Sequence, residues 1–321
     1  MHPSTPSHAH LIGPDGEEWE HLWQPHVVQS VLRQLGRAPS QSLGQNFLVD
    51  RNVLNRILQI ASLRSCDHVL EIGAGLGVLT RALSAVTERV TAIEIDSAMA
   101  SASRDATADR PNVRILQQDI RETELISVFR GVPRDQCHVV ANLPYNISKV
   151  ILRKFIVERR AIRSVTVMLQ KEVAERMVAR PATPAYGLIA VAYGLFGEPE
   201  IACSVSRNCF YPKPGVDSAV VRTNLSVHPR FSITDEDFFF RVVRAGFSQR
   251  RKTLLNSMQA NLDVLHPRAG VRSADCSLTR DGLRERILNA GIDPERRAET
   301  LTTEEFATLT HHILRSGQGP T

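Results

Sequence analysis

The fold of this chain is decided at residues 67–77, which read D-H-V-L-E-I-G-A-G-L-G. An apolar run leads into glycines, and residues 78–83 continue with the apolar spacing of a helix. Glycines at a strand-to-helix turn let the backbone approach a ligand closely at the helix N-terminus. The stretch therefore predicts a strand, a ligand-binding turn at Gly73 and Gly75, and a helix of an α/β fold.

Three further apolar segments predict strands that end in polar side chains. They are residues 90–96, 113–116 and 137–140. Ligands of open α/β sheets bind at the carboxyl ends of the strands, where these segments place Glu94, Asp119 and Asn142. We expect Glu94 to accept the hydroxyls of a ribose and Asp119 to accept from the amino group of a cofactor adenine. Asp96 is expected to cap the next helix.

The spacing of the glycines separates two cofactors. A dinucleotide enzyme typically has G-x-G-x-x-G, whereas this chain has G-x-G-x-G and offers no acid for hydride transfer. A smaller cationic cofactor suits strand ends that carry acids. The pattern therefore favours S-adenosylmethionine.

The stretch N-L-P-Y, residues 142–145, predicts the chemistry. The exocyclic amine of adenine is a poor nucleophile because its lone pair is delocalised into the ring, but two hydrogen-bond acceptors on its N–H groups localise that pair. The Asn142 side chain and the Leu143 carbonyl are the expected acceptors. Pro144 stiffens the turn, and Tyr145 offers a face on which a base stacks. Taken alone, the same residues also suit an ordinary turn.

Two other positions are open to two interpretations. Asn46 and Leu48 precede a predicted helix, which Asp50 caps. Asn46 therefore either contacts a ligand or belongs to a polar loop. Phe210 lies in a proline-stiffened turn that leads to a final strand. It either sandwiches a flipped base with Tyr145 or packs in the core.

The chain divides into three predicted parts, which are an N-terminal extension at 1–37, a catalytic domain at 38–229 and a helical domain at 230–321. We expect the extension to be partly disordered, although residues 17–35 could form a helix. The four helices expected in the last part are 235–247, 252–262, 280–290 and 303–314. A basic segment in this part suits contact with RNA phosphates. Its cations are Arg244, Arg250, Arg251 and Lys252.

Composition limits the classes of function. A chain of 321 residues with 42% hydrophobic and 23% charged residues is typical of a globular protein, and we expect neither a secretion signal nor a membrane span. The net charge of +5 favours a polyanionic partner. Five cysteines without a C-x-x-C pair support neither a disulfide framework nor a metal site. We expect a cytoplasmic monomer.

Taken together, these motifs resemble the family of small-subunit ribosomal RNA adenine N6,N6-dimethyltransferases. The resemblance runs from about Ser42 to Phe306. The motifs, in the family's order, are G-Q-N-F-L, E-I-G-A-G-L-G, A-I-E-I-D, Q-Q-D-I, A-N-L-P-Y-N-I-S, F-Y-P-K-P-G-V-D-S-A-V-V-R, F-S-Q-R-R-K-T and G-I-D-P-E-R-R-A-E-T-L.

The resemblance implies a Rossmann-like methyltransferase fold, with a mostly parallel seven-stranded sheet and a small C-terminal helical domain. It implies S-adenosylmethionine as cofactor and, as substrate, two adjacent adenosines in the 3′-terminal hairpin of small-subunit rRNA in the immature subunit, each methylated twice. The family's cofactor contacts fall on Asn46, Leu48, Gly73, Glu94, Asp119 and Asn142, and its base-stacking aromatics on Tyr145 and Phe210.

The chain departs from the family pattern at Ala74, at Lys149 and at residues 188–190, where an arginine is lost. Two alternatives are a resistance-type adenine methylase of large-subunit rRNA and a non-catalytic RNA-binding assembly or transcription factor on the same fold. The F-S-Q-R-R-K-T stretch and the long C-terminal region argue against the first. The intact N-L-P-Y, with Glu94 and Asp119, argues against the second.

Overall fold

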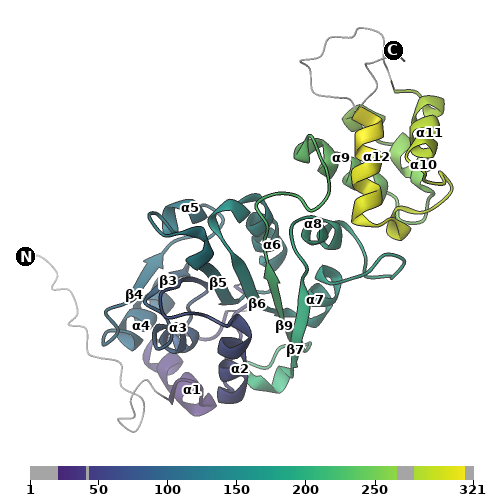
Figure 1. The fold of residues 1–321 in the computed structure, drawn as a ribbon. Helices are drawn as coiled ribbons and strands as arrows, with labels where there is room; N and C mark the ends of the chain where they lie inside the picture. The colour runs from purple at the N-terminus through teal and green to yellow at the C-terminus, as the bar shows by residue number, and fades with distance from the viewer. Residues whose placement is uncertain (1–20, 41–42, 266–277, 315–321) are drawn as a thin grey trace, which may run out of the picture. The chain divides into compact units, whose positions relative to one another are not determined.

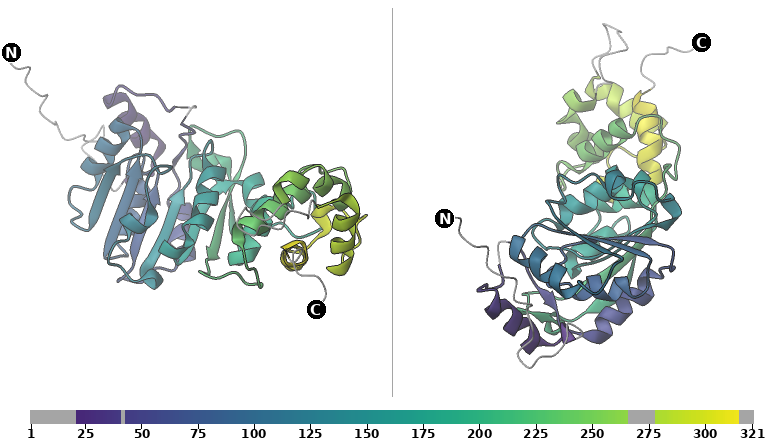
Figure 2. Two further views of the ribbon diagram at one scale, coloured as in Figure 1. Left: turned by 90° about the horizontal axis from the view of Figure 1, so that it is seen from above. Right: turned by 90° about the vertical axis from the view of Figure 1, so that its left-hand side faces the viewer.

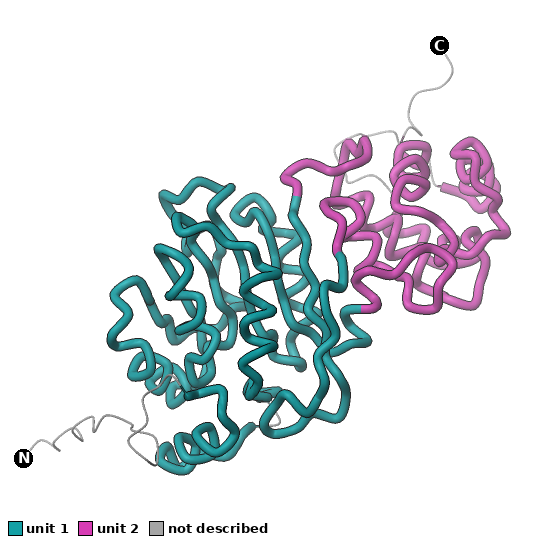
Figure 3. The backbone as a smooth tube through the Cα atoms, turned by 60° about the horizontal axis from the view of Figure 1, so that its bottom comes forward, with its two compact units in different colours: residues 1–174, 200–225 teal, residues 175–199, 226–321 magenta. Residues whose placement is uncertain are grey.

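The structure, a computed structural model, describes residues 21–40, 43–265 and 278–314 (Figure 1). The chain forms two compact units (Figure 3). Unit 1 comprises residues 1–174 and 200–225, and unit 2 comprises residues 175–199 and 226–321. The predicted ranges differ from these units in residues 175–199 and 226–229, which cluster with the C-terminal helices. The predicted extension at 1–37 is part of unit 1.

Unit 1 is built on a seven-stranded sheet with the order β4-β3-β2-β5-β6-β9-β7. Its strands are β2 (His68–Ile72), β3 (Arg89–Glu94), β4 (Val113–Gln117), β5 (Cys137–Asn142), β6 (Ser164–Gln170), β7 (Glu200–Val205) and β9 (Ser218–Asn224). β9 runs antiparallel to both of its neighbours, whereas the other pairs are parallel. The predicted Rossmann-like α/β fold with a mostly parallel sheet is confirmed.

Helices cover both faces of this sheet (Figure 2). They are α2 (Arg51–Ala61), α3 (Val78–Ser84), α4 (Ser97–Ala106), α5 (Leu125–Val128), α6 (Ser148–Val157) and the start of α7 (Lys171–Met177). Asp50 caps α2 and Asp96 caps α4, each through a carboxylate oxygen that accepts two backbone N–H groups. Both caps agree with the sequence analysis.

The strands form the core of unit 1 because most of their side chains are apolar on both faces, as is typical of covered parallel strands. All five residues of β2 are buried, and Val139 and Val140 of β5 are at most 1% exposed. Burying one such side chain stabilises the fold by about 1.5–3 kcal/mol. This core fixes the carboxyl ends of β2, β3 and β5, where the predicted site lies.

The N-terminal helix α1 (Pro25–Gln34) is shorter than predicted, because Pro25 occupies its first position. Its buried face, which includes Val28 and Val31, packs in one cluster with Leu76 of the glycine-rich turn and Met99 of α4. Residues 1–20 of the predicted extension lie outside the described residues. The part of the extension that is described therefore belongs to the core of unit 1.

Unit 2 contains α8 (Leu188–Phe196), α9 (Glu236–Phe247), α10 (Leu254–Gln259), α11 (Arg280–Asn289) and α12 (Thr303–Leu314). The last four agree with the predicted helices within a few residues. α8 was not predicted, because an almost uniformly apolar segment shows no helical periodicity. The preceding loop packs within this unit: Ala182 donates its N–H to the carbonyl of Glu299, and Tyr186 is 3% exposed.

Strand β7 and a two-stranded sheet were also missed. β7 lies at the edge of the main sheet and is mostly exposed, so its sequence lacks a clear apolar pattern. The small sheet pairs β1 (Phe47–Leu48) with β8 (Phe210–Tyr211). Two residues on each side are too short for a periodic signal.

Within the described ranges, none of the helices has the length and apolar character that crossing a membrane requires. No group of three or more His, Cys, Asp or Glu side chains in those ranges is arranged to hold a metal ion. Cys66, Cys137, Cys203 and Cys209 are free thiols. Cys276 lies outside the described residues.

Candidate functional site

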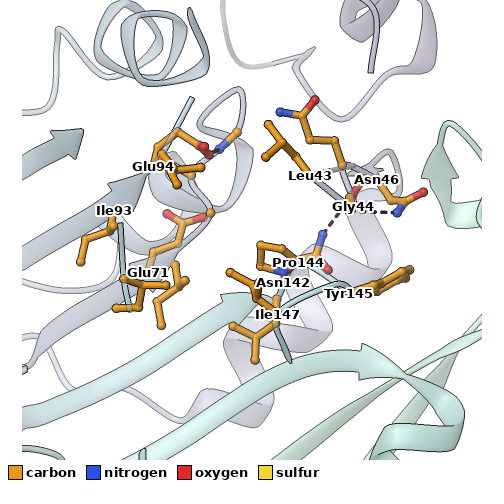
Figure 4. A pocket seen from close by; sticks show the side chains of 18 of the residues that line it. Leu43, Gly44, Asn46, Glu71, Ile93, Glu94, Asn142, Pro144, Tyr145 and Ile147 are labelled. Carbon is orange, nitrogen blue, oxygen red and sulfur yellow. Dashed lines mark hydrogen bonds between the residues drawn. The ribbon is translucent and has the colours of Figure 1, made fainter. Parts of the chain in front are cut away.

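A cavity of about 210 Å³ opens at the carboxyl ends of β2, β3 and β5 (Figure 4). It brings together residues that are up to about a hundred positions apart in the sequence. The predicted site residues that line it are Asn46, Leu48, Gly73, Gly75, Glu94, Asp119, Asn142, Leu143, Pro144 and Tyr145.

The glycine-rich turn after β2 forms one wall. Gly73 and Gly75 adopt φ angles of 79° and 55°, a region that favours glycine. A side chain at position 75 would also crowd Phe47, whose ring carbon would lie 3.3 Å from its Cβ. Both glycines are therefore required by the backbone, and they leave the wall free of side chains.

Glu94 ends β3 and is 7% exposed. Its Oε2 accepts the N–H of Gly75 at 2.9 Å, and its Oε1 accepts the N–H of Asp96 at 2.9 Å. Burial raises the pKa of this carboxyl, and the two backbone bonds oppose that shift. Each oxygen keeps capacity for a further donor, which suits the hydroxyls of a ribose.

Asp119 also lines the cavity, but it has a partner that the sequence analysis did not anticipate. Arg121 donates from Nη2 to Oδ2 at 2.5 Å and from its backbone N–H to Oδ1 at 2.8 Å. The bonded guanidinium lowers the pKa of Asp119. A ligand at Asp119 would therefore share the carboxylate with Arg121, whose side chain is 54% exposed and also lines the cavity.

Asn142, the last residue of β5, is held by its amide nitrogen. Nδ2 donates to the carbonyl of Asn46 at 3.1 Å, as the dashed line in Figure 4 marks. Oδ1 is buried and, among the described residues, has no hydrogen-bond partner. Leaving such an oxygen without a donor costs about 1–3 kcal/mol. The side chain therefore presents an oriented acceptor that a ligand donor would satisfy.

The residues after Asn142 form a rigid turn. Leu143 donates its N–H to the carbonyl of Met168 at 3.1 Å, and the Tyr145 hydroxyl forms a 2.6 Å hydrogen bond with the Ser218 hydroxyl. The loop at Gly44 packs closely on this turn, because a Cβ there would lie 3.1 Å from the backbone N of Tyr145. The Tyr145 ring is thus fixed at the cavity wall.

Glu71 in β2 is a cavity residue to which the sequence analysis gave no role (Figure 4). It is 2% exposed and accepts a 2.5 Å hydrogen bond from the Thr80 hydroxyl. Burial raises its pKa to about 8, against the effect of Thr80 and together with the charge of Glu94. A carboxylate inside a buried strand was the signal that could have identified it.

Some predicted residues lie away from the cavity wall. Phe210 is 4% exposed and packs in a core cluster with Leu48 and Val220, so the structure favours the core interpretation. Its stacking role stays a prediction. The basic residues Arg244, Arg250, Arg251 and Lys252 are exposed in unit 2, where Arg250 donates to the carbonyl of Tyr186 at 3.4 Å.

The chain is similar to known proteins in both sequence and structure. Residues 38–269 match the model of the family described as Ribosomal RNA adenine dimethylase. The chain is 40% identical over 293 residues to a Ribosomal RNA small subunit methyltransferase A of Geobacillus thermodenitrificans, with 90% of this chain and 96% of that protein covered. A protein of the same name from Bacillus cereus is also 40% identical, over 294 residues, with the same shares covered.

Two solved structures are similar over 84% of this chain. The crystal structure of a dimethyladenosine transferase from Plasmodium falciparum has a TM-score of 0.70 and 27% identity, and 98% of it is covered. The crystal structure of the 23S rRNA methyltransferase ErmE has a TM-score of 0.61 and 25% identity, and all of it is covered.

Proposed function

Because the chain belongs to the ribosomal RNA adenine dimethylase family, we infer that it transfers methyl groups from S-adenosylmethionine to N6 of adenosines in small-subunit rRNA. The observation that carries the assignment of the site is the buried Oδ1 of Asn142, which lines the cavity without a donor among the described residues. An adenine amine is a donor that fits this acceptor.

The cavity residues suit S-adenosylmethionine. Gly73 and Gly75 leave the wall open to close approach, Glu94 has acceptor capacity for the ribose hydroxyls, and Asp119 lies at the end of the adjacent strand. Asn46 and Leu48 would complete the cofactor contacts. When bound, the cofactor would supply an electrophilic methyl group, whose bond to the sulfonium sulfur would break as the bond to N6 forms, leaving S-adenosylhomocysteine.

The residues of the chain make the amine nucleophilic. Oδ1 of Asn142 accepts one N–H of the adenine amine and the Leu143 carbonyl accepts the other, so the lone pair is localised on N6. Pro144 stiffens the turn, and the Tyr145 ring, fixed through Ser218, stacks on the base. As N6 gains a methyl group it becomes cationic, and both acceptors stabilise that charge in the transition state. A proton then leaves N6 to solvent. In the second transfer N6 keeps a single N–H, which donates to one of the two acceptors, and the proton lost afterwards again goes to solvent.

We propose that the substrate is a pair of adjacent adenosines in the 3′-terminal hairpin of the immature small subunit, and that modification takes part in subunit biogenesis in the cytoplasm. The chain would act as a monomer without a metal. Phosphate contacts are assigned to Arg244, Arg250, Arg251 and Lys252, whose exposure supports this role.

The likeness to ErmE supports a second candidate, methylation of large-subunit rRNA. The small-subunit function is preferred because the 40% identical relatives cover 90% of this chain and 96% of their own length.

The test is product mapping. We expect the full chain, incubated with S-adenosylmethionine and each unmodified ribosomal subunit, to give N6,N6-dimethyladenosine at two adjacent positions of small-subunit rRNA by mass spectrometry. Methylation confined to the large subunit would establish the second candidate instead, and absence of any methylation would point to the non-catalytic alternative.

A further inference from the structure

Helix α6 begins directly beside the cavity. Ile147 lines the cavity, and the helix starts at the next residue, Ser148. One face of the helix packs into unit 1 through buried side chains. These are Ser148, Ile151, Leu152, Phe155 and Ile156. The opposite face is left to solvent.

The residues exposed between 148 and 160 form one surface, which we name the α6 stripe. They are Lys149, Val150, Arg153, Val157 and Arg160. Steps of three and four residues place Lys149, Val150, Arg153 and Val157 on the same side of α6. Arg160 lies in the 3-10 turn that follows the helix. Val150 is 52% exposed and Val157 is 64% exposed. The stripe therefore combines three cations with two apolar side chains.

No carboxylate on this helix neutralises the stripe. Glu158, the one acid between 148 and 160, is half-buried, pairs with Lys154 and accepts the N–H of Leu125 at 2.6 Å. In the part of the chain that the structure describes, no ion pair or hydrogen bond engages the side chain of Lys149, Arg153 or Arg160. The stripe thus presents uncompensated positive charge next to the cavity.

We propose that the α6 stripe binds the phosphates of the rRNA strand that flanks the adenosine held in the cavity. This inference rests on the proposed function and names a surface that positions its substrate. An adenine that reaches a buried acceptor must leave its stack, so the backbone on either side of it has to cross the mouth of the cavity. The first residue of the stripe, Lys149, lies two positions after the cavity residue Ile147.

The geometry favours a strand that follows the helix. Lys149 and Arg153 are one turn apart, about 6 Å along the axis, so neighbouring phosphates can bind both. Val150 offers apolar surface to the sugars between them. Toward the other end of the stripe, α6 approaches α5 through Glu158, and the exposed Glu122 and Glu124 precede α5. We therefore expect Lys149 and Arg153 to contribute more than Arg160.

The test is the salt dependence of RNA affinity for the double variant Lys149→Ala/Arg153→Ala of the full chain. The probes are the 3′-terminal hairpin of small-subunit rRNA and an unrelated hairpin of equal length. We expect affinity for both to fall by about 10-fold at 0.1 M salt, and the slope of log K against log salt to flatten by about 1.4–1.8, the contribution of two phosphates. The Kd for S-adenosylmethionine should not change.

The matched control is Arg104→Ala/Arg114→Ala, which removes two exposed cations from α4 and β4. It should leave the slope unchanged, and Lys149→Arg with Arg153→Lys should retain the parent's affinity. Equal effects of the two double variants, or no effect of either, would overturn the proposal. Failure of the parent to methylate the unmodified small subunit would contradict the proposed function. The proposal for the α6 stripe is tested separately, by the affinity for both hairpins.

Discussion

The two ends of the parallel strands carry buried polar side chains of different kinds. At the amino end of β2, Asp67 is 1% exposed and accepts two bonds from Arg64, at 2.7 Å from its backbone N–H and 3.0 Å from Nε. His138 of β5 lies 3.3 Å from the same carboxylate. At the carboxyl ends, Glu94 receives backbone N–H groups and the Oδ1 of Asn142 has no donor among the described residues.

The difference separates structural from functional polar groups. Side chains that bond one another stabilise the fold and have little capacity left for a ligand. The Oδ1 of Asn142 lacks a donor and lines the cavity, so a ligand donor explains it. Nδ1 of His68 and Nε2 of His138, at the amino end, also lack hydrogen-bond partners among the described residues, but neither histidine lines this cavity. We therefore assign the amino end to folding and the carboxyl end to binding and chemistry.

The largest effect is expected at Asn142. Asn142→Ala should lower the rate of methyl transfer by about 10² or more, because its acceptor acts mainly on the transition state. Single-turnover transfer at saturating cofactor and RNA separates this loss from binding. The free energy of unfolding should change little, because the loss of the bond to the Asn46 carbonyl, about 0.5–1.5 kcal/mol, is offset by the removal of a buried oxygen that has no donor among the described residues. A rate within a few-fold of the parent would remove Asn142 from the chemistry.

The corresponding change at the amino end is Asp67→Ala. It should lower the free energy of unfolding by about 1–3 kcal/mol, because the N–H of Arg64 loses its buried acceptor. Urea denaturation measures this value. Single-turnover transfer by the folded variant should match the parent, and a large loss of rate with unchanged stability would reverse the assignment of the two ends.

Glu71 shares one property with each group of polar side chains. It lines the cavity, as the functional groups do, and it is bonded to another side chain, Thr80, as the structural groups are. Its raised pKa of about 8 means that the native state binds its proton more tightly than the unfolded state. Stability should therefore fall as the pH rises from about 4.5, the unfolded pKa, through about 8. Glu71→Gln should remove a loss of about 3–4 kcal/mol between pH 5 and 8. Parallel stability curves for parent and variant would show that Glu71 is ionised throughout.

The smallest effect is expected for Tyr145→Phe. It removes the bond to Ser218 but keeps the ring, so stability should fall by about 0.5–1.5 kcal/mol and methyl transfer should change by less than about threefold. Tyr145→Ala, which removes the stacking face, should lower transfer by about tenfold. Equal rates for the two variants would exclude stacking by this ring.

Much of the site was predictable because its residues follow apolar strands. The strand pattern and the glycine-rich turn placed Gly73, Glu94 and Asn142 at one edge of the sheet, and the structure brings them to one cavity. The bond between Tyr145 and Ser218 joins residues that are 73 positions apart, so no local pattern could predict it. The pairing of Asp119 with Arg121 depends on side-chain geometry, and α8 lacks the periodicity that identifies a helix.

The most direct test of the different roles of the two strand ends is calorimetric titration of S-adenosylmethionine into the variants Glu94→Ala and Asp67→Ala. Both variants are measured folded, at 25 °C. Each variant loses a buried carboxylate, one from each end of the strands. We expect Glu94→Ala to weaken binding by about 1–3 kcal/mol, Glu94→Gln to fall between it and the parent, and Asp67→Ala to bind within about twofold of the parent. Unchanged affinity in Glu94→Ala, or an equal loss in Asp67→Ala, would contradict the assignment of the carboxyl end as the cofactor site.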